Sequence, residues 1–249
     1  MISIKTKEEI NKIKESGTIN YLTHEHLKKL IIPGITTNYL NEEADKFIRK
    51  HGGIPSFLNY QGFPKSICVS VNDEIVHGIP SDKVLKEGDI VSIDIGVLKD
   101  GYHSDSARTH AVGKISKTNE KLIYHTEKML YKGLSEIKDG ASLGNIGFRI
   151  IEHAKKYKYS VVRELVGHGI GKNLHEDPDV PNYGKYNTGI ILKTGMVIAV
   201  EPMINLGKRY IKQLDNDEWT IFTKDKKNSA HFEHTVVVTD EGYEILTGE

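Results

Sequence analysis

The stretch Val91–Thr109, "VSIDIGVLKDGYHSDSART", reads as a β-hairpin that carries acids in its buried part. From Val91 to Val97 every second residue is apolar, which is the alternation of a half-buried strand. The segment "KDG" (Lys99–Gly101) favours a turn, and a second strand follows it. Asp94 and Asp105 fall on these two strands at nearly opposed positions. A half-buried hairpin with two carboxylates predicts a functional site.

The second half of the chain repeats the pattern of the first. "LKEGDIVSID", which ends at Asp94, matches "LKTGMVIAVE", which ends at Glu201, in its apolar positions and in its final acid. A second acidic strand follows in each half, with Asp105 in one and Glu233 in the other. We therefore predict a duplicated helix–helix–strand unit whose four acids converge about a pseudo-twofold axis.

Helical and extended segments are expected around these acids. Thr6 and Glu9 form a capping box for a first helix that reaches Leu30, and Thr37 is expected to cap a second one before Gly52. Helical spacing of apolar residues also covers 119–137 and 143–158. Strand-like runs are expected at 66–71, 195–204 and 232–239.

Length and composition exclude several classes of protein. A chain of 249 residues is predicted to form a single catalytic domain, 1–249, with pseudo-repeat halves of about 1–115 and 116–249. Lys plus Arg equals Asp plus Glu at 34 each, so no net charge favours DNA or a membrane as partner. The single Cys68 excludes an internal disulfide and a multi-cysteine zinc site. The polar N-terminal segment and the lack of a long apolar run predict a cytoplasmic location.

Four converging carboxylates require a counter-charge, because like charges in a dry cleft cannot all stay ionised. Divalent metal ions are the expected counter-charge, and two are predicted. His168 lies in "GHGIG", where glycines leave the imidazole accessible. An oxygen-rich set with one imidazole suits Mn²⁺, Fe²⁺ or Co²⁺. Two such ions activate a bridging water and polarise a carbonyl, as in metal-dependent aminopeptidases.

Five motifs, in this order, resemble those of type I methionine aminopeptidases: "NDEIVHGIP", "IDIGVLKDGYHSD", "GHGIGKNLHEDP", "EPMI" and "FEHTVVVT". The resemblance covers essentially the whole chain. It implies an α+β pita-bread (creatinase/aminopeptidase) fold, with two pseudo-symmetric helix–helix–strand halves around a curved antiparallel sheet. It also implies removal of the initiator methionine from nascent polypeptides.

The resemblance assigns roles to individual residues. It implies two divalent ions (Co, Mn, Fe, Ni or Zn), with Asp105 and Glu233 bridging them and Glu201 relaying a proton from the attacking water. The full ligand set that it implies is Asp94, Asp105, His168, Glu201 and Glu233.

The same resemblance implies a substrate pocket. His175 would sit by the scissile carbonyl, and His77 would contact the nitrogen of the second residue, so that a small second residue is favoured. The methionine side chain would lie among apolar and sulfur groups, which suit a thioether: Tyr60, Phe63, Cys68, Leu174 and Trp219. Leu174 stands where an aromatic residue is expected in many relatives, and Phe63 lacks the hydroxyl that some relatives have, yet both keep the pocket apolar. A monovalent cation is expected near Asn72 and Ser229.

Other members of the fold are distinguishable. Type II enzymes carry a long insertion before the acid that matches Glu201, and the 26 positions from His175 to Glu201 are too few for it. Xaa-Pro peptidases and creatinase add a large N-terminal domain, whereas only 93 residues precede Asp94. The alternatives left open are a non-catalytic pita-bread protein that binds nucleic acid or a partner, and an aminopeptidase with another first-residue preference.

Remaining expectations concern the other histidines, Cys68 and assembly. Strand alternation is expected to turn three histidines away from the acids, namely His103, His110 and His234. The histidines expected in solvent are His24, His26, His51, His125 and His153. Cys68 is expected to be a packed pocket wall. The lysine-rich "KDKKNS" (224–229) is read as a solvated loop, with a transient ribosome contact as the alternative, and the chain is predicted to be a monomer.

Overall fold

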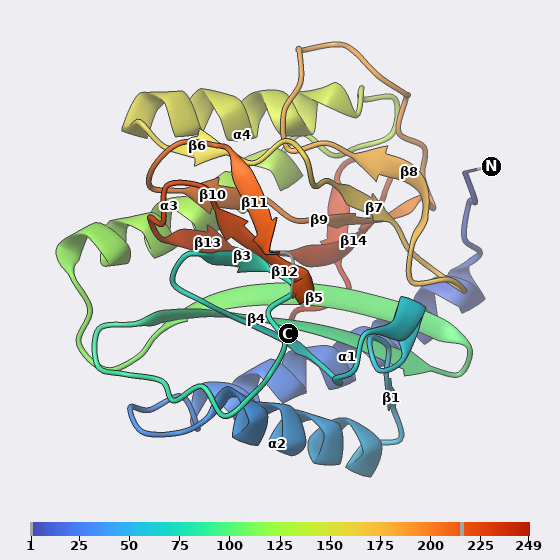
Figure 1. Cartoon of the computed structure of the whole chain (residues 1–249). Coiled ribbons are helices and arrows are strands. Elements are labelled where there is room, and N and C mark those ends of the chain that lie inside the picture. Colours follow the sequence, from blue (N-terminus) through green and yellow to red (C-terminus); the bar gives the residue numbers. More distant parts are fainter. Residues whose placement is uncertain (1, 215–216) are drawn as a thin grey trace.

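The computed structural model describes residues 2–214 and 217–249, in which a layer of strands lies between two pairs of helices (Figure 1). Helices α1 and α2 lie below the strands in this view, and α3 and α4 lie above them. The helices are α1 (Lys7–Lys28), α2 (Thr37–Lys50), α3 (Lys117–Leu134), α4 (Gly144–Tyr157) and a short 3-10 helix, η1 (Tyr60–Gly62). The predicted order of two helices per half is thus observed.

The starts of the helices follow local capping chemistry. Thr6 and Glu9 form the predicted capping box, in which each side chain accepts a hydrogen bond from the other residue's backbone N–H. The predicted cap of α2 was wrong by one residue. Thr36 is extended and caps the helix, while Thr37 is its first residue and donates its hydroxyl to the backbone carbonyl of Ser81. The Thr37 hydroxyl is thus engaged by a residue that is distant in sequence, and it does not cap the helix.

The predicted hairpin consists of β4 (Ile90–Lys99) and β5 (Tyr102–Ala111), paired antiparallel over their full length. Asp94 pairs with Ala107 and Asp105 pairs with Gly96, so the two acids are diagonal neighbours on one face. The opposite edge of β4 pairs with two short strands, and this completes a four-stranded sheet: β1 (Ile54–Pro55) and β2 (Cys68–Val71).

The second half builds a five-stranded antiparallel sheet, in the order β15-β14-β9-β7-β8. Its strands are β7 (Gly167–Gly169), β8 (Glu176–Val180), β9 (Val197–Val200), β14 (His234–Val238) and β15 (Tyr243–Ile245). The strand expected over 195–204 is interrupted at Glu201–Pro202, since proline cannot donate to a sheet ladder. Glu201 therefore lies at a break between strands.

Two three-stranded sheets complete the layer. One consists of β6 (Ser160–Val161), β10 (Met203–Asn205) and β13 (Ser229–His231). The other consists of β3 (Glu74–Val76), β11 (Ile211–Leu214) and β12 (Asp217–Thr223). The strands predicted as one curved sheet thus divide into four antiparallel sheets.

The two halves meet where β5 runs beside β14. The backbone N–H of Asp105 donates to Thr235 Oγ1 at 2.9 Å, and Thr235 Oγ1 donates back to the Asp105 carbonyl at 2.7 Å. The N–H of Glu233 donates to the Ala107 carbonyl at 2.9 Å. These bonds bring the second acid of each half together, as the pseudo-twofold arrangement predicts.

The apolar face of β4 decides which way its acid points. Ile93 and Ile95 are fully buried in a cluster with residues of α2, among them Leu40 and Ile48. Each such side chain stabilises the fold by about 1.5–3 kcal/mol. Because side chains alternate along a strand, Asp94 must point away from α2, toward the second half.

Within residues 2–214 and 217–249, no helix combines the length and the apolar character needed to cross a bilayer.

Candidate active site

A cavity of about 330 Å³ opens between the two halves and contains every residue assigned to the site from sequence. Nineteen residues line it in all. Twelve of them are the predicted site residues: Tyr60, Phe63, Cys68, His77, Asp94, Asp105, His168, Leu174, His175, Glu201, Trp219 and Glu233. One end of the cavity is acidic and the other is apolar and aromatic.

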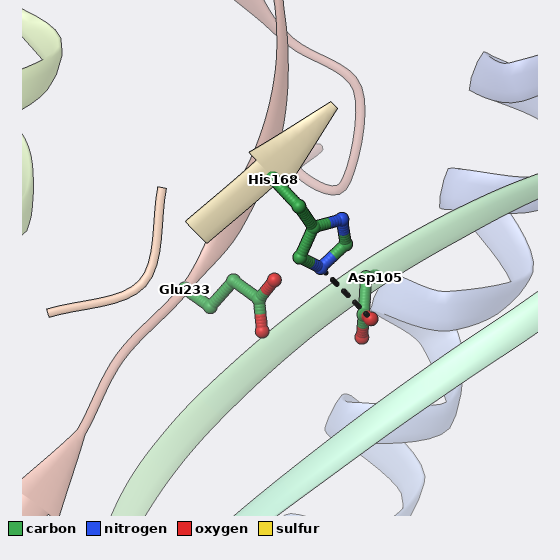
Figure 2. Close-up of side chains that lie close together, drawn as sticks. All are labelled: Asp105, His168 and Glu233. Atoms are coloured by element: carbon green, nitrogen blue, oxygen red, sulfur yellow. Dashed lines mark ion pairs between the residues drawn. The ribbon is translucent and has the colours of Figure 1, made fainter. Parts of the chain in front are cut away.

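Side chains from three different segments converge at the acidic end (Figure 2). Asp105 comes from β5, His168 from β7, and Glu233 from the link between β13 and β14. One ligand atom from each of the three lies within 4.8 Å of the other two. His168 Nε2 is 3.9 Å from Asp105 Oδ2 and 3.7 Å from Glu201 Oε1, so Glu201 joins the same cluster.

Burial strongly opposes ionisation of the carboxylates. It raises the pKa of Asp94 to about 6 and that of Glu201 to about 8. Burial, reinforced by the neighbouring acids, also raises the pKa of Asp105 and of Glu233 well above the ordinary carboxyl value. Metal-free, the cluster therefore holds protons at neutral pH that a bound cation would displace.

The acidic end has buried carboxylate oxygens that make no hydrogen bond and could bind a divalent cation. Asp94 Oδ1, Asp105 Oδ1 and Glu233 Oε1 are buried and have no hydrogen-bond partner among the described residues. Buried polar atoms are rarely left without a partner unless an ion or a water satisfies them. Four carboxylates and one imidazole form the oxygen-rich donor set that Mn²⁺, Fe²⁺ and Co²⁺ accept.

His168 is prepared to offer its Nε2 lone pair. Its Nδ1 lies 2.8 Å from the Gly169 carbonyl oxygen, which can only accept, so Nδ1 carries the proton. Burial lowers the pKa of His168 to about 3, and the ring is therefore neutral. Gly169 permits this packing, because a Cβ there would lie 2.2 Å from the Asp177 carbonyl oxygen.

His175 and His77 also line the cavity. His175 Nδ1 is 2.8 Å from the Tyr60 hydroxyl, and its ring meets that of His168 edge-on with centroids 4.2 Å apart. If the Tyr60 hydroxyl donates this bond, His175 Nε2 carries the ring proton. Burial lowers the pKa of His175, and it lowers that of His77 to about 4, so both rings are neutral.

The apolar end is formed by tightly packed side chains. Phe63, Cys68 and Leu174 are each less than 5% exposed, and the rings of Phe63 and Trp219 meet edge-to-face at 5.2 Å. Burial, then the charge of Asp94, raises the pKa of the Cys68 thiol well above its ordinary value. Cys68 is therefore a neutral wall of the pocket, in line with its expected role and unlike an activated nucleophile.

Gly96 shapes the wall beside the acids. It lies on the same face of the hairpin as Asp94, opposite Asp105. A Cβ at Gly96 would lie 2.5 Å from the Phe57 ring and 2.8 Å from Ser56 Cβ. Phe57 also lines the cavity, so the absence of a side chain at Gly96 brings this aromatic ring against the acidic hairpin.

The residues expected to hold a monovalent cation lie together. The Ser229 N–H donates to the Asn72 carbonyl at 2.9 Å. The Ser229 hydroxyl donates to the Ile204 carbonyl at 3.2 Å. Asn72 has a positive φ of 57°. These contacts place Asn72 beside Ser229, and a monovalent cation there stays a prediction.

The predictions for the remaining histidines were only partly right. His110 and His234 do point away from the acids, into a second cavity of about 530 Å³. His103 was placed wrongly: two residues from Asp105 on one strand, it shares that residue's face, and its Nδ1 lies 2.8 Å from Ser56 Oγ. His24 and His153 are buried rather than solvated, and His24 Nε2 lies 3.0 Å from the Ser106 carbonyl.

Sequence reasoning missed His231. Its Nε2 lies 3.6 Å from Glu201 Oε2 and 4.0 Å from Glu233 Oε2, although it does not line the cavity. A signal was present in the sequence, because His231 precedes Glu233 by only two positions.

Comparison with known proteins identifies the family. Residues 11–240 match metallopeptidase family M24. Methionine aminopeptidase 1 of Bacillus subtilis (strain 168) is 55% identical over 247 residues, which cover 99% of both chains. This coverage leaves essentially no part of either chain unmatched.

Solved structures agree. The crystal structure of methionine aminopeptidase from Rickettsia prowazekii superposes with a TM-score of 0.98 at 45% identity, covering 99% of this chain and 100% of that one. The prolidase from Pyrococcus furiosus superposes with a TM-score of 0.78 at 26% identity, covering 99% of this chain but 65% of the longer prolidase. The predicted fold is confirmed, and the chain belongs to metallopeptidase family M24.

Proposed function

We propose that this chain is a methionine aminopeptidase, a metal-dependent exopeptidase that removes the N-terminal methionine from proteins. The observation that carries the proposal is the single cavity in which a cluster of acids and a histidine adjoins an apolar pocket. A scissile peptide bond would lie at the cluster of such a site, with the preceding side chain among Phe63, Cys68 and Trp219. The identity of 55% to a curated methionine aminopeptidase over the whole chain supports the same activity.

The residues that would hold the metal are those of the acidic end. We assign two divalent ions (Co, Mn, Fe, Ni or Zn) to one set of ligands: Asp94, Asp105, His168, Glu201 and Glu233. When bound, these ions would polarise the scissile carbonyl and increase the acidity of a bridging water molecule. Two observations support this set. Three of its carboxylates have a buried oxygen without a hydrogen-bond partner among the described residues, and Nε2 of His168 is unprotonated.

The protein groups supply proton transfer and positioning. Glu201 is the candidate general base, because its carboxylate lines the cavity at the acidic end, with Oε1 3.7 Å from His168 Nε2. His175 can donate Nε2–H to the carbonyl oxygen as negative charge develops there, provided that Tyr60 donates to its Nδ1. His77, on the cavity wall, would contact the nitrogen of the second residue and limit that residue's size.

The biological setting follows from this activity. Its substrates would be the N-termini of nascent polypeptides, which are made in the cytoplasm. We assign the chain to that compartment as a monomer, with the lysine-rich loop 224–229 solvated and a transient ribosome contact of that loop as the alternative. A monovalent cation at Asn72 and Ser229 would be structural, since it would link β13 to the turn before β3.

The decisive experiment compares His168→Ala with wild type on a Met-Ala-Ser peptide, with bound metal measured in parallel. We expect loss of hydrolysis together with loss of metal in a folded protein, because His168 supplies the only nitrogen of the ligand set. Full activity in His168→Ala would refute the proposed site. A peptide panel varied only at the first position tests the methionine preference, and faster release of another residue would favour the alternative aminopeptidase specificity.

A further inference from the structure

His231 is a buried histidine beside the acidic cluster to which the proposed mechanism gives no role. It ends β13, is 2% exposed, and its Nε2 has no hydrogen-bond partner among the described residues. Two carboxylates lie close to this nitrogen, Glu201 Oε2 at 3.6 Å and Glu233 Oε2 at 4.0 Å. A buried ring nitrogen without a partner calls for an explanation.

The backbone of His231 is fixed by two hydrogen bonds to the acidic hairpin. The His231 N–H donates to Thr109 Oγ1 at 2.9 Å, and the same hydroxyl donates to the His231 carbonyl at 2.8 Å. Thr109 lies on β5, four residues after Asp105, and pairs with Ser92 of β4. Both strands of the acidic hairpin therefore fix the position from which the imidazole reaches Glu201.

The two oxygens of Glu201 face different histidines. Oε1 lies 3.7 Å from His168 Nε2, on the cavity side, whereas Oε2 lies 3.6 Å from His231 Nε2. His231 does not line the cavity, whereas Glu201 and His168 do. His231 Nε2 therefore approaches Glu201 from the side of the carboxylate that faces away from the cavity. From there it can orient the carboxylate, but it is poorly placed to reach an ion in the cavity.

We propose that His231 is a positioning residue for Glu201, donating Nε2–H toward Oε2 and thereby directing Oε1 into the cavity. This inference rests on the role proposed for Glu201. Partners that orient a ligating carboxylate typically change metal affinity or activity by about 10–100-fold when they are removed. The rival reading is that Nε2 offers its lone pair as a further metal ligand.

The test uses His231→Leu, which removes the donor, and His231→Gln, whose side-chain amide restores an N–H at similar reach. His110→Leu is the matched control, because His110 is also a strand histidine with an unpartnered, buried Nε2, but on the far face. For each variant we would measure the metal dissociation constant by calorimetry, and kcat and KM separately on Met-Ala-Ser at saturating metal.

We expect His231→Leu to weaken metal binding at least tenfold and to lower kcat at least tenfold, with KM within about twofold, and His231→Gln to recover most of both. His110→Leu should match wild type in both measurements. Near-wild-type behaviour of His231→Leu would overturn the proposal. Equal impairment of His231→Gln and His231→Leu would also overturn it, in favour of coordination or packing. Because calorimetry needs no peptide, failure of the proposed peptidase activity would be seen separately.

Discussion

Replacing Glu201 by glutamine should make the metal-free protein more stable at pH 8 and should flatten the dependence of its stability on pH. Burial raises the pKa of Glu201 from 4.5 to about 8. Below pH 4.5 the carboxyl is protonated in both the folded and the unfolded chain. Between these values the unfolded chain releases the proton while the folded chain keeps it, so stability falls as the pH rises through the folded pKa.

The size of the effect follows from the same two pKa values. Their separation, at ~1.4 kcal/mol per pKa unit, corresponds to about 5 kcal/mol for Glu201 taken alone. Asp94, Asp105 and Glu233 interact with the same charge, so removal of one carboxylate also eases ionisation of the others. We expect Glu201→Gln to gain about 2–5 kcal/mol at pH 8, which raises Tm by at least ~4 °C.

The assay is thermal and urea unfolding of chelator-treated protein at pH 5 and pH 8, followed by circular dichroism. Glu136→Gln is the matched control, because the Glu136 side chain is 15% exposed, as is that of Glu201, but it pairs with Arg149. The control should keep the wild-type fall in stability between pH 5 and pH 8. The reasoning is refuted if wild type does not lose stability over this range, or if Glu136→Gln flattens the profile as much as Glu201→Gln does.

Three further predictions concern the cavity. His175→Ala should lower kcat by about 10²-fold or more while bound metal, measured by elemental analysis, stays at the wild-type level; equal loss of metal would place His175 among the ligands. Gly96→Ala should lower the free energy of unfolding, measured in urea, by about 1–3 kcal/mol and raise KM for methionyl peptides, because the new Cβ would meet the Phe57 ring. Gly242→Ala is the control and should leave both quantities unchanged, because the space around Gly242 is open. Adding Mn²⁺ or Co²⁺ to metal-free wild type should raise Tm at pH 8 more than at pH 5, since the cation replaces protons; a larger rise at pH 5 would contradict this.

Predictions from the sequence agree best with the structure where the feature depends only on residues close together in the chain. The capping box of Thr6 and Glu9, the β4–β5 hairpin and the face on which Asp94 lies all follow from nearest-neighbour geometry. The duplication extended this local reading to Glu201 and Glu233, because two similar segments fold alike and pack symmetrically. That is why the acidic end of the cavity could be assembled from a list of motifs.

Two of the misses, at Thr37 and His24, arise from contacts between segments distant in sequence. Thr37 does not cap α2 because its hydroxyl is bonded to Ser81, and His24 is buried because β5 lies over it. The error at His103 is different, since correct counting along the strand would have avoided it.

Order along the chain predicts which side of a strand or helix a residue occupies, since that depends on a backbone period of two or 3.6 residues. It therefore predicted the acids, the helices and the hairpin. The distances of 3.6 to 3.9 Å among His168, His231, Asp105 and Glu201 arise only when β5, β7 and β13 have packed together. Those spacings depend on how side chains from separate segments fill one interior, and no period within a single segment encodes them.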